Sequence, residues 1–192
     1  MPDKTKVSTG KAKTTGSVHR APAGTSLPTD ATTALANTFV DLGYISKEGL
    51  TNSAERTTAS EKAWGGDIVA IFSTDKTDKF KFKFIESLNA DVLKSIYGAS
   101  NVTVTTTQIS IAEKNIDPEF AVWVFDMILK TGGYKRIVVP EGAIVSVGDI
   151  VYVDEGLIGY EVTIDTLADA SGNTHYEYIS IPTTGSGGAV TP

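Results

Sequence analysis

Hydrophobic and polar residues alternate most clearly over residues 78–85. Three phenylalanines alternate there with three lysines, at Phe80, Phe82 and Phe84 and at Lys79, Lys81 and Lys83. A period of two places successive side chains on opposite faces of a strand, so one face lies on a core and the other faces solvent. The stretch therefore predicts a half-buried strand with a cationic outer face.

The pattern then changes from strand to helix. Asn89 offers an N-cap side chain, Asp91 lies in the first turn, where the helix dipole favours an anion, and Gly98 stands where a glycine ends a helix. The apolar residues between these signals fall on one side of a helix, at Val92, Leu93, Ile96 and Tyr97. We expect this side to lie on a sheet. Residues 101–111 alternate again, and a one-residue shift near 107–108 predicts a bulge or bend.

Short apolar runs bounded by turn residues predict the remaining strands. They lie at residues 39–45, 67–73, 119–130, 134–139, 143–147, 150–153, 157–167 and 175–181. A polar turn over residues 73–78 separates the 67–73 strand from the Phe/Lys strand. Residues 119–130 are apolar on both faces, which favours a strand covered on both sides over a buried helix. They form a hairpin with residues 134–139, which Pro140 ends.

About nine strands and one helix make the chain mainly β, and we expect a β-sandwich or open barrel with one flanking α-helix. Residues 26–182 would form this domain. Residues 1–25 are rich in Lys, Thr, Gly and Ser and predict a flexible basic arm, and residues 183–192 predict a flexible Gly/Ser end. Residues 28–38 fit either a weak helical turn or an extended segment.

Residues 50–66 are polar almost throughout and close on Trp64 and two glycines. A structureless connection of this length is uncommon inside a compact domain, so the segment is either a functional loop or an extended hairpin. Trp64 is then either a core plug at the base of the loop or an exposed anchor for a partner.

Charge is distributed unevenly along the 192 residues, whose net charge is −6. Residues 1–20 carry five basic residues and one acidic residue, a net charge of +4, so the remainder carries −10. A body of that sign does not favour nucleic-acid binding, because phosphate contacts need Lys and Arg. The basic arm could bind phosphate or the acidic surface of another copy, and we expect it to be disordered in the free subunit.

Catalytic and metal-binding patterns are missing from the sequence. There is no cysteine, and neither His19 nor His175 has a second ligand at metal-binding spacing. No nucleophile elbow or phosphate-binding loop occurs, and the adjacent carboxylates Asp154 and Glu155 would point to opposite faces of a strand. No apolar run approaches a membrane span, and no targeting signal is visible. We expect a soluble protein that is no enzyme and needs neither metal nor cofactor.

Eight short stretches carry a resemblance through their order along the chain. They are residues 21–24 (APAG), 27–31 (LPTDA), 42–45 (LGYI), 49–51 (GLT), 62–66 (KAWGG), 82–86 (FKFIE), 159–164 (GYEVTI) and 169–173 (DASGN). In that order they resemble the major tail tube protein of long-tailed bacteriophages, especially those that infect actinobacteria. The resemblance covers about residues 20–180.

The resemblance implies a β-sandwich with a flanking helix, whose sheets join across six copies into a ring. Stacked rings form the hollow tail through which the genome leaves the capsid. The protein would then be part of the virion tail, assembled in the host cytoplasm without a membrane. Its partners would be further copies of itself and the tape measure, tail terminator and baseplate proteins, with DNA as non-specific cargo in the lumen. A lumen rich in carboxylates would let DNA slide, which agrees with the acidic body.

The family's extended loop, which reaches the neighbouring ring, corresponds to residues 50–66. The resemblance therefore implies ring-stacking contacts at Glu55, Arg56, Glu61, Lys62 and Trp64. Terminal arms of the family order on stacking, so the basic arm would dock on the acidic body of an adjacent subunit. Its docking candidates are Lys4, Lys6, Lys11, Lys13 and Arg20. The cationic face of residues 78–85 argues against a position facing DNA, unless acidic neighbours cancel its charge.

A function of another class stays open beside this one. The chain could be a β-sandwich carbohydrate-binding or adhesion module, with Trp64, Tyr176 and Tyr178 as a stacking platform for a sugar. Both functions predict the same fold. They differ in the role of residues 50–66 and of the basic arm, for which the binding module has no use.

Overall fold

Nine antiparallel strands form one large sheet in the part of the chain that the computed structural model describes, residues 2–13, 16–114, 116–130 and 132–181. Seven follow the order β3-β2-β8-β9-β10-β5-β4, while β1 pairs with β8 and β11 pairs with β9. Their bounds are β1 Gly10–Ala12, β2 Val18–Pro22, β3 Val40–Asp41, β4 Thr51–Lys62, β5 Ile68–Phe84, β8 Ala121–Leu129, β9 Tyr134–Val147, β10 Tyr160–Thr166 and β11 Tyr176–Ile179. The mainly β architecture is confirmed, and the sheet does not close into a barrel.

The smaller elements lie outside this sheet. A two-stranded sheet joins β6 (Val102–Val104) to β7 (Ile109–Ile111), and it follows the α-helix α1 (Ala90–Tyr97) along the chain. Two 3-10 turns complete the elements, η1 (Lys4–Lys6) and η2 (Ala99–Asn101). Residues 101–111 thus form a tight hairpin around the predicted bend.

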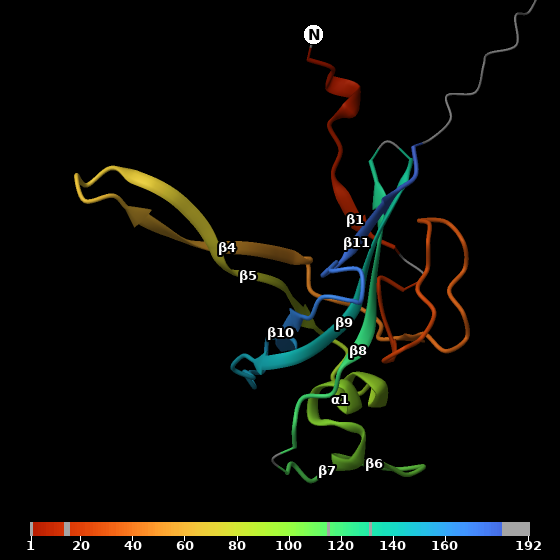
Figure 1. The fold of residues 1–192 in the computed structure, drawn as a ribbon. Helices are drawn as coiled ribbons and strands as arrows, with labels where there is room; N and C mark the ends of the chain where they lie inside the picture. Colours follow the sequence, from red (N-terminus) through yellow and green to blue (C-terminus); the bar gives the residue numbers. More distant parts are fainter. Residues whose placement is uncertain (1, 14–15, 115, 131, 182–192) are drawn as a thin grey trace, which may run out of the picture.

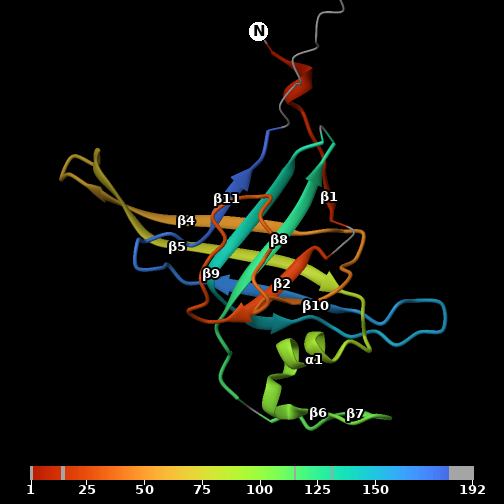
Figure 2. The ribbon, with the colours of Figure 1, turned by 90° about the vertical axis from the view of Figure 1, so that its right-hand side faces the viewer.

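Strand β9 joins the two parts of the large sheet. One edge of β9 pairs with β8, and the opposite edge pairs first with β11 and then with β10. Beyond β10 the sheet continues into β5 and β4, which cross the direction of β8 and β9 in Figure 2. The curvature brings β5 against β8, because the ring of Phe125 lies 5.5 Å from that of Phe80 and 5.4 Å from that of Phe82.

The main core fills the space inside this curved sheet. The three phenylalanines of the Phe/Lys strand are buried there, as predicted. Trp123 of β8 is also buried, and its Nε1 donates to the carbonyl of Gly142 at 3.0 Å. Aromatic side chains with a satisfied polar atom of this kind supply much of the burial that stabilises a small β domain.

An irregular segment, residues 23–39, covers the other face of β8 and β9. Val122, Val124 and Val138 are buried beneath it. Arg136 holds the segment in place, because it binds both carboxylate oxygens of Asp126, at 2.7 and 2.8 Å, and donates to the carbonyls of Asp30 and Thr33. The prediction that residues 119–130 form a strand covered on both sides is therefore confirmed.

Helix α1 begins and ends where the sequence predicts. Asn89 Oδ1 accepts hydrogen bonds from the backbone amides of Asp91 and Val92, and Gly98 follows the last turn with a φ of 86°. Val92 and Leu93 are buried in the main core. The helix lies at the lower end of the sheet in Figure 1.

Two predicted strand ends are wrong. The expected turn over residues 73–78 does not form, because β5 runs unbroken while β4 supplies its hydrogen bonds. Likewise β9 continues through Pro140. Proline lacks an amide donor, but this position lies at a register shift against β8 and between the segments of β9 that pair with β11 and β10.

Other predicted elements are shorter or lie elsewhere. Residues 39–45 contain only β3, and residues 150–153 form no strand. Residues 18–22, expected in the flexible arm, form β2 and pair with β8 along their whole length. Val18 and Ala21 of this strand are buried, so the partner strand supplies the apolar surface that the arm lacks by itself. The predicted Gly/Ser end, 183–192, lies outside the described residues.

Candidate assembly surface

A long hairpin projects from the body of the molecule. It consists of β4 and the outer half of β5, drawn in orange and yellow at the left of Figure 1. β10 pairs with β5 only from Lys79 inward, so from Asp78 outward β5 is paired with β4 alone. All twelve residues of β4 are exposed. Of the two interpretations of residues 50–66, the extended hairpin is confirmed.

The tip of the hairpin presents a tryptophan to solvent. Residues 63–67 form the turn, in which the amide of Ala63 donates to Asp67 and that of Gly66 donates to Ala63, both at 2.8 Å. Gly66 has a φ of 94°, a conformation that suits glycine. Trp64 is fully exposed. The interpretation of Trp64 as a core plug is therefore wrong, and its side chain is available to a partner.

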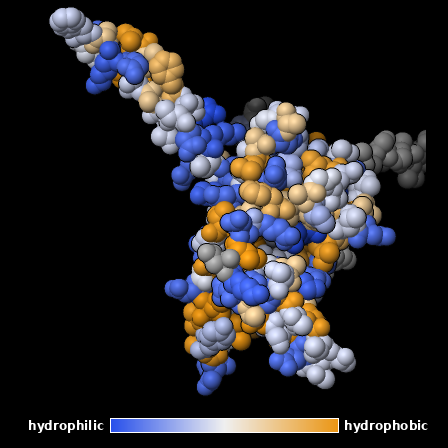
Figure 3. Space-filling model, turned by 60° about the horizontal axis from the view of Figure 1, so that its bottom comes forward, coloured by the Kyte–Doolittle hydropathy of each residue, from blue (hydrophilic) through white to orange (hydrophobic). Residues whose placement is uncertain are grey.

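Both faces of the hairpin carry apolar side chains. Successive residues of a strand point to opposite faces, and Ile71 and Phe72 are 67% and 55% exposed. Ile68 and Val69, nearer the tip, are also exposed. Figure 3 shows apolar atoms near the tip of the projection and polar atoms closer to the body. Exposed apolar groups gathered on one element mark an interaction site.

The predicted ring-stacking residues all lie on this hairpin. Glu55 and Arg56 lie midway along it, opposite Thr77 and Lys76, and Glu61 and Lys62 lie near the tip, opposite Ala70 and Ile68. The sequence did not reveal that the four apolar residues of the outer half of β5, Ile68, Val69, Ile71 and Phe72, are exposed. A run such as residues 68–72 is also typical of a core strand. The signal that distinguishes the two cases is the partner strand, which has no apolar residue larger than alanine.

Asp78 lies at the base of the hairpin, where β5 enters the core. It is 3% exposed, and its carboxylate accepts hydrogen bonds from Asn52 Nδ2 at 2.7 Å and Thr174 Oγ1 at 2.8 Å. His175 Nδ1 lies beside the same carboxylate. Burial raises the pKa of Asp78, but the hydrogen bonds from Thr174, Asn52 and His175 outweigh it and hold the pKa below its ordinary value.

The outer face of β5 and β10 is polar and close to neutral. Lys79 Nζ lies 3.3 Å from Asp165, and Lys81 Nζ lies 2.8 Å from Glu161. These side chains remain about half exposed. The lysine face predicted from the sequence therefore has acidic neighbours that offset its charge.

The basic residues of the predicted arm divide into two groups. Lys4 and Lys6 lie in η1, beyond the sheet, and Lys11 lies in the short strand β1. Lys13 Nζ lies 3.9 Å from Asp126. Arg20 belongs to β2 and contacts its own chain.

The side chain of Arg20 contacts two residues near the end of β2. Its Nη2 donates to Glu119 at 2.7 Å, and the guanidinium lies 5.8 Å from the centre of the Trp123 ring. Among the docking candidates, Arg20 therefore has the closest contacts within its own chain.

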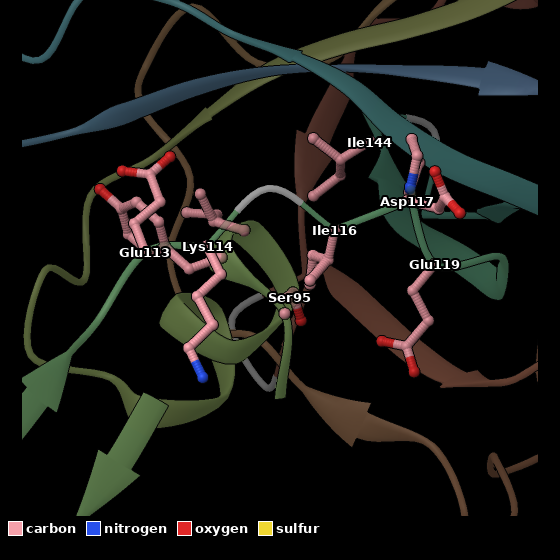
Figure 4. Close-up of a pocket in the computed structure, with 11 residues that line it drawn as sticks. Ser95, Glu113, Lys114, Ile116, Asp117, Glu119 and Ile144 are labelled. Atoms are coloured by element: carbon pink, nitrogen blue, oxygen red, sulfur yellow. The ribbon is translucent and has the colours of Figure 1, made fainter. Parts of the chain in front are cut away.

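A pocket between α1 and residues 113, 114 and 116–119 contains several charged side chains (Figure 4). Glu113 and Lys114 lie on one side of it, and Asp117 and Glu119 lie on the other. The carboxylates do not converge on one point, so they form no acid–base pair. In the described residues there is no group of three side chains that could hold a metal ion, and no helix there could span a membrane.

The aromatic residues of the proposed sugar platform do not lie together. Tyr176 and Tyr178 stack in β11 with ring centres 6.4 Å apart, and both pack partly against the core. Trp64 lies at the tip of the hairpin, which extends away from β11 in Figure 1. The structure therefore offers no single platform of three rings.

Comparison with models of protein families identifies the family. A family model described as phage tail tube protein matches residues 10–187, nearly the whole chain. No curated protein matches.

Proposed function

The chain belongs to the phage tail tube protein family, and we propose that its copies close into rings of six that stack into a hollow tube through which DNA passes. The family places the protein in the virion tail as a structural protein. Ring size, the stacking contact and the passage of DNA are the parts that the proposal adds.

The projecting hairpin is the observation that carries the proposal. It exposes apolar side chains on both faces, because no other described part of its own subunit covers them. In a family that builds a tube, another copy is the partner that such an element would meet. We assign the contact with the neighbouring ring to its apolar side chains and to Glu55, Arg56, Glu61, Lys62 and Trp64.

Strand edges supply the contact within a ring. The sheet ends on one side at β4 and on the other side at the two-residue strand β3. Only residues 51–53 of β4 lie beside the body, because the strand continues from there into the projecting hairpin. An exposed strand edge favours pairing with another chain. Head-to-tail pairing of different edges generates a closed ring when the rotation between copies allows it.

We assign the polar face of β4, β5 and β10 to the lumen. Two of its three lysines, Lys79 and Lys81, are paired with Asp165 and Glu161, which reduces the positive charge that would hold the phosphate backbone. The opposite face of β10 and of the inner part of β5 carries side chains of the core, among them the three phenylalanines, and cannot be exposed.

Lys4, Lys6 and Lys11 are the remaining candidates for docking of the N-terminal segment on the acidic body of an adjacent subunit. Opposite charges of this kind attract over about 8 Å at physiological salt, and the attraction weakens as salt is added. At the two ends of the tail, the tape measure, terminator and baseplate proteins would be the further partners.

Electron microscopy of the purified protein in negative stain tests the proposal. Samples at increasing protein concentration, and at low and high salt, should show rings or hollow tubes, with light scattering that rises at the same concentrations. A protein that stays monomeric under all conditions and binds a carbohydrate on a glycan array would support the binding module and contradict the tube.

A further inference from the structure

A projecting hairpin can reach the same site in every neighbouring copy only if its direction is fixed. Outward from Asp78, β5 pairs with β4 alone, and most side chains of this ribbon are exposed. A two-stranded ribbon without packing is marginally stable by itself and bends readily. Its direction must therefore be set at its base.

The side chain of Asp78 connects the base of the hairpin to two other segments. Asn52 donates to it from β4, across the ribbon, while Thr174 donates from the segment that precedes β11. His175 Nδ1, from that same segment, lies beside the same carboxylate oxygen as Thr174.

The backbone of the same residues adds two further contacts. Thr166 Oγ1 of β10 donates to the carbonyl of Asp78 at 3.0 Å, and Asn52 also donates to the carbonyl of Lys79 at 3.3 Å. Four segments of the chain therefore meet at one residue, which is the first buried residue of β5 after the exposed ribbon.

We propose that Asp78 is the positioning residue of the hairpin: by binding Asn52, Thr174 and His175 at once, it fixes the direction of the β4–β5 ribbon relative to the sheet. The importance of this direction for assembly rests on the stacking role assigned to the hairpin above. Asp78 itself is buried within its own subunit.

The contacts around Asp78 restrict the geometry of the hairpin base in addition to stabilising it. A carboxylate that accepts several hydrogen bonds binds more strongly than a neutral acceptor and limits the positions of its donors. The ring of His175 is held from a second side as well, because it stands edge-on to Phe80 at 5.5 Å with an angle of 88° between the rings. The core therefore fixes the position of the His175 ring, and the ring in turn restricts the position of Asp78.

Spin-label distances in the unassembled subunit test this proposal directly. The chain has no cysteine, so labels can be placed by Lys62→Cys near the tip and Lys94→Cys on α1, and their distance distribution can be measured by pulsed electron resonance. Asp78→Asn should broaden the distribution. Asp75→Asn makes the same chemical change on the exposed part of β5 and should leave the distribution as it is in the wild type.

His175→Phe provides a second variant that does not depend on whether Asp78→Asn folds. It keeps an aromatic ring beside Phe80 but removes the donor to Asp78. It should broaden the distribution too, and hydrogen exchange of the amides at the hairpin base should speed up by about tenfold, as expected when a hydrogen bond to a buried carboxylate is lost. A distribution as narrow as that of the wild type in both variants would overturn the proposal.

Assembly is measured separately, so that the positioning role of Asp78 and the stacking role of the hairpin can be refuted independently. A broader distribution together with a higher concentration threshold for tubes supports both the positioning role and the stacking role. A broader distribution with unchanged tubes supports the role of Asp78 and contradicts the stacking role of the hairpin.

Discussion

Replacing Phe72 by alanine should weaken assembly and leave the subunit folded. Phe72 lies on the projecting hairpin, opposite Ala59, and more than half of its surface faces solvent in the single subunit. If the hairpin packs against a neighbouring ring, this exposed part becomes buried only on assembly. The substitution therefore removes contact area from the assembled state alone.

The exposed fraction sets the size of the effect. A phenylalanine that is 55% exposed has about 110 Å² left to bury, if full burial covers about 200 Å². At about 25 cal/mol per Å², and allowing for the methyl group that alanine keeps, the loss is about 2 kcal/mol per subunit. This loss corresponds to a rise of about 30-fold in the protein concentration at which tubes form.

Sedimentation measures this threshold, with tubes in the pellet and free subunits in the supernatant. Ser73→Ala is the matched control, because it changes the neighbouring residue of the same strand without removing apolar area. Urea unfolding should give both variants the stability of the wild type to within about 0.5 kcal/mol, as for exposed positions in general.

A threshold for Phe72→Ala within about threefold of the wild type would refute the burial of this face on assembly, since it corresponds to less than about 0.7 kcal/mol. Ile71→Ala tests the opposite face in the same way. A large effect from only one of the two substitutions would show that the hairpin lies flat on a partner and is not inserted between two surfaces.

Three further predictions concern the subunit itself. Arg136→Met removes both guanidinium hydrogen bonds to the buried carboxylate of Asp126 and leaves only Lys13, at 3.9 Å, to offset its charge, so it should cost about 3–5 kcal/mol in urea unfolding; a loss below about 1 kcal/mol would contradict the role of the Arg136–Asp126 pair. Burial lowers the pKa of His19 below 6.5, although Asp41 and Asp126 act in the opposite direction. Protonation of His19 therefore favours the unfolded state. As the pH falls from about 7.5 to about 5.5, the wild type should lose more stability than His19→Gln. Equal losses would show that His19 is not the group involved. Gly142→Ala places a methyl group 2.8 Å from Ile164 and should destabilise the subunit by about 1–3 kcal/mol, which thermal unfolding would detect; an unchanged melting temperature would contradict the close packing there.

The sequence predicts best the elements whose pattern is set by their own burial. The Phe/Lys strand has one buried face, and α1 carries both its cap and its apolar side, so each can be identified without knowledge of its neighbours. The strand at residues 119–130 is apolar on both faces because the main core and residues 23–39 cover it from opposite sides.

The predictions that failed concern elements whose structure depends on a partner strand. β2 has few apolar residues and is ordered by pairing with β8. The outer half of β5 contains polar residues that are typical of a turn, and it remains a strand because β4 runs beside it. Pro140 stays within β9 since neither neighbouring strand needs an amide there. Partners far away along the chain cannot be inferred from a local pattern.

The sequence indicates where the projecting hairpin lies but not which apolar residues it exposes. Residues 50–66 were expected to reach a neighbour, on the basis of a family resemblance and an unusual length, and the structure shows the hairpin. Its apolar residues could not be recognised, because Ile71 and Phe72 have the same pattern whether they face a core of their own or another subunit.

Cryo-electron microscopy of the assembled protein tests the central claim most directly. A reconstruction should show rings of six subunits around an open channel, with each β4–β5 hairpin crossing to the next ring and Phe72 covered there. Hairpins that stay within their own ring, or that project freely into solvent between the rings, would contradict the account.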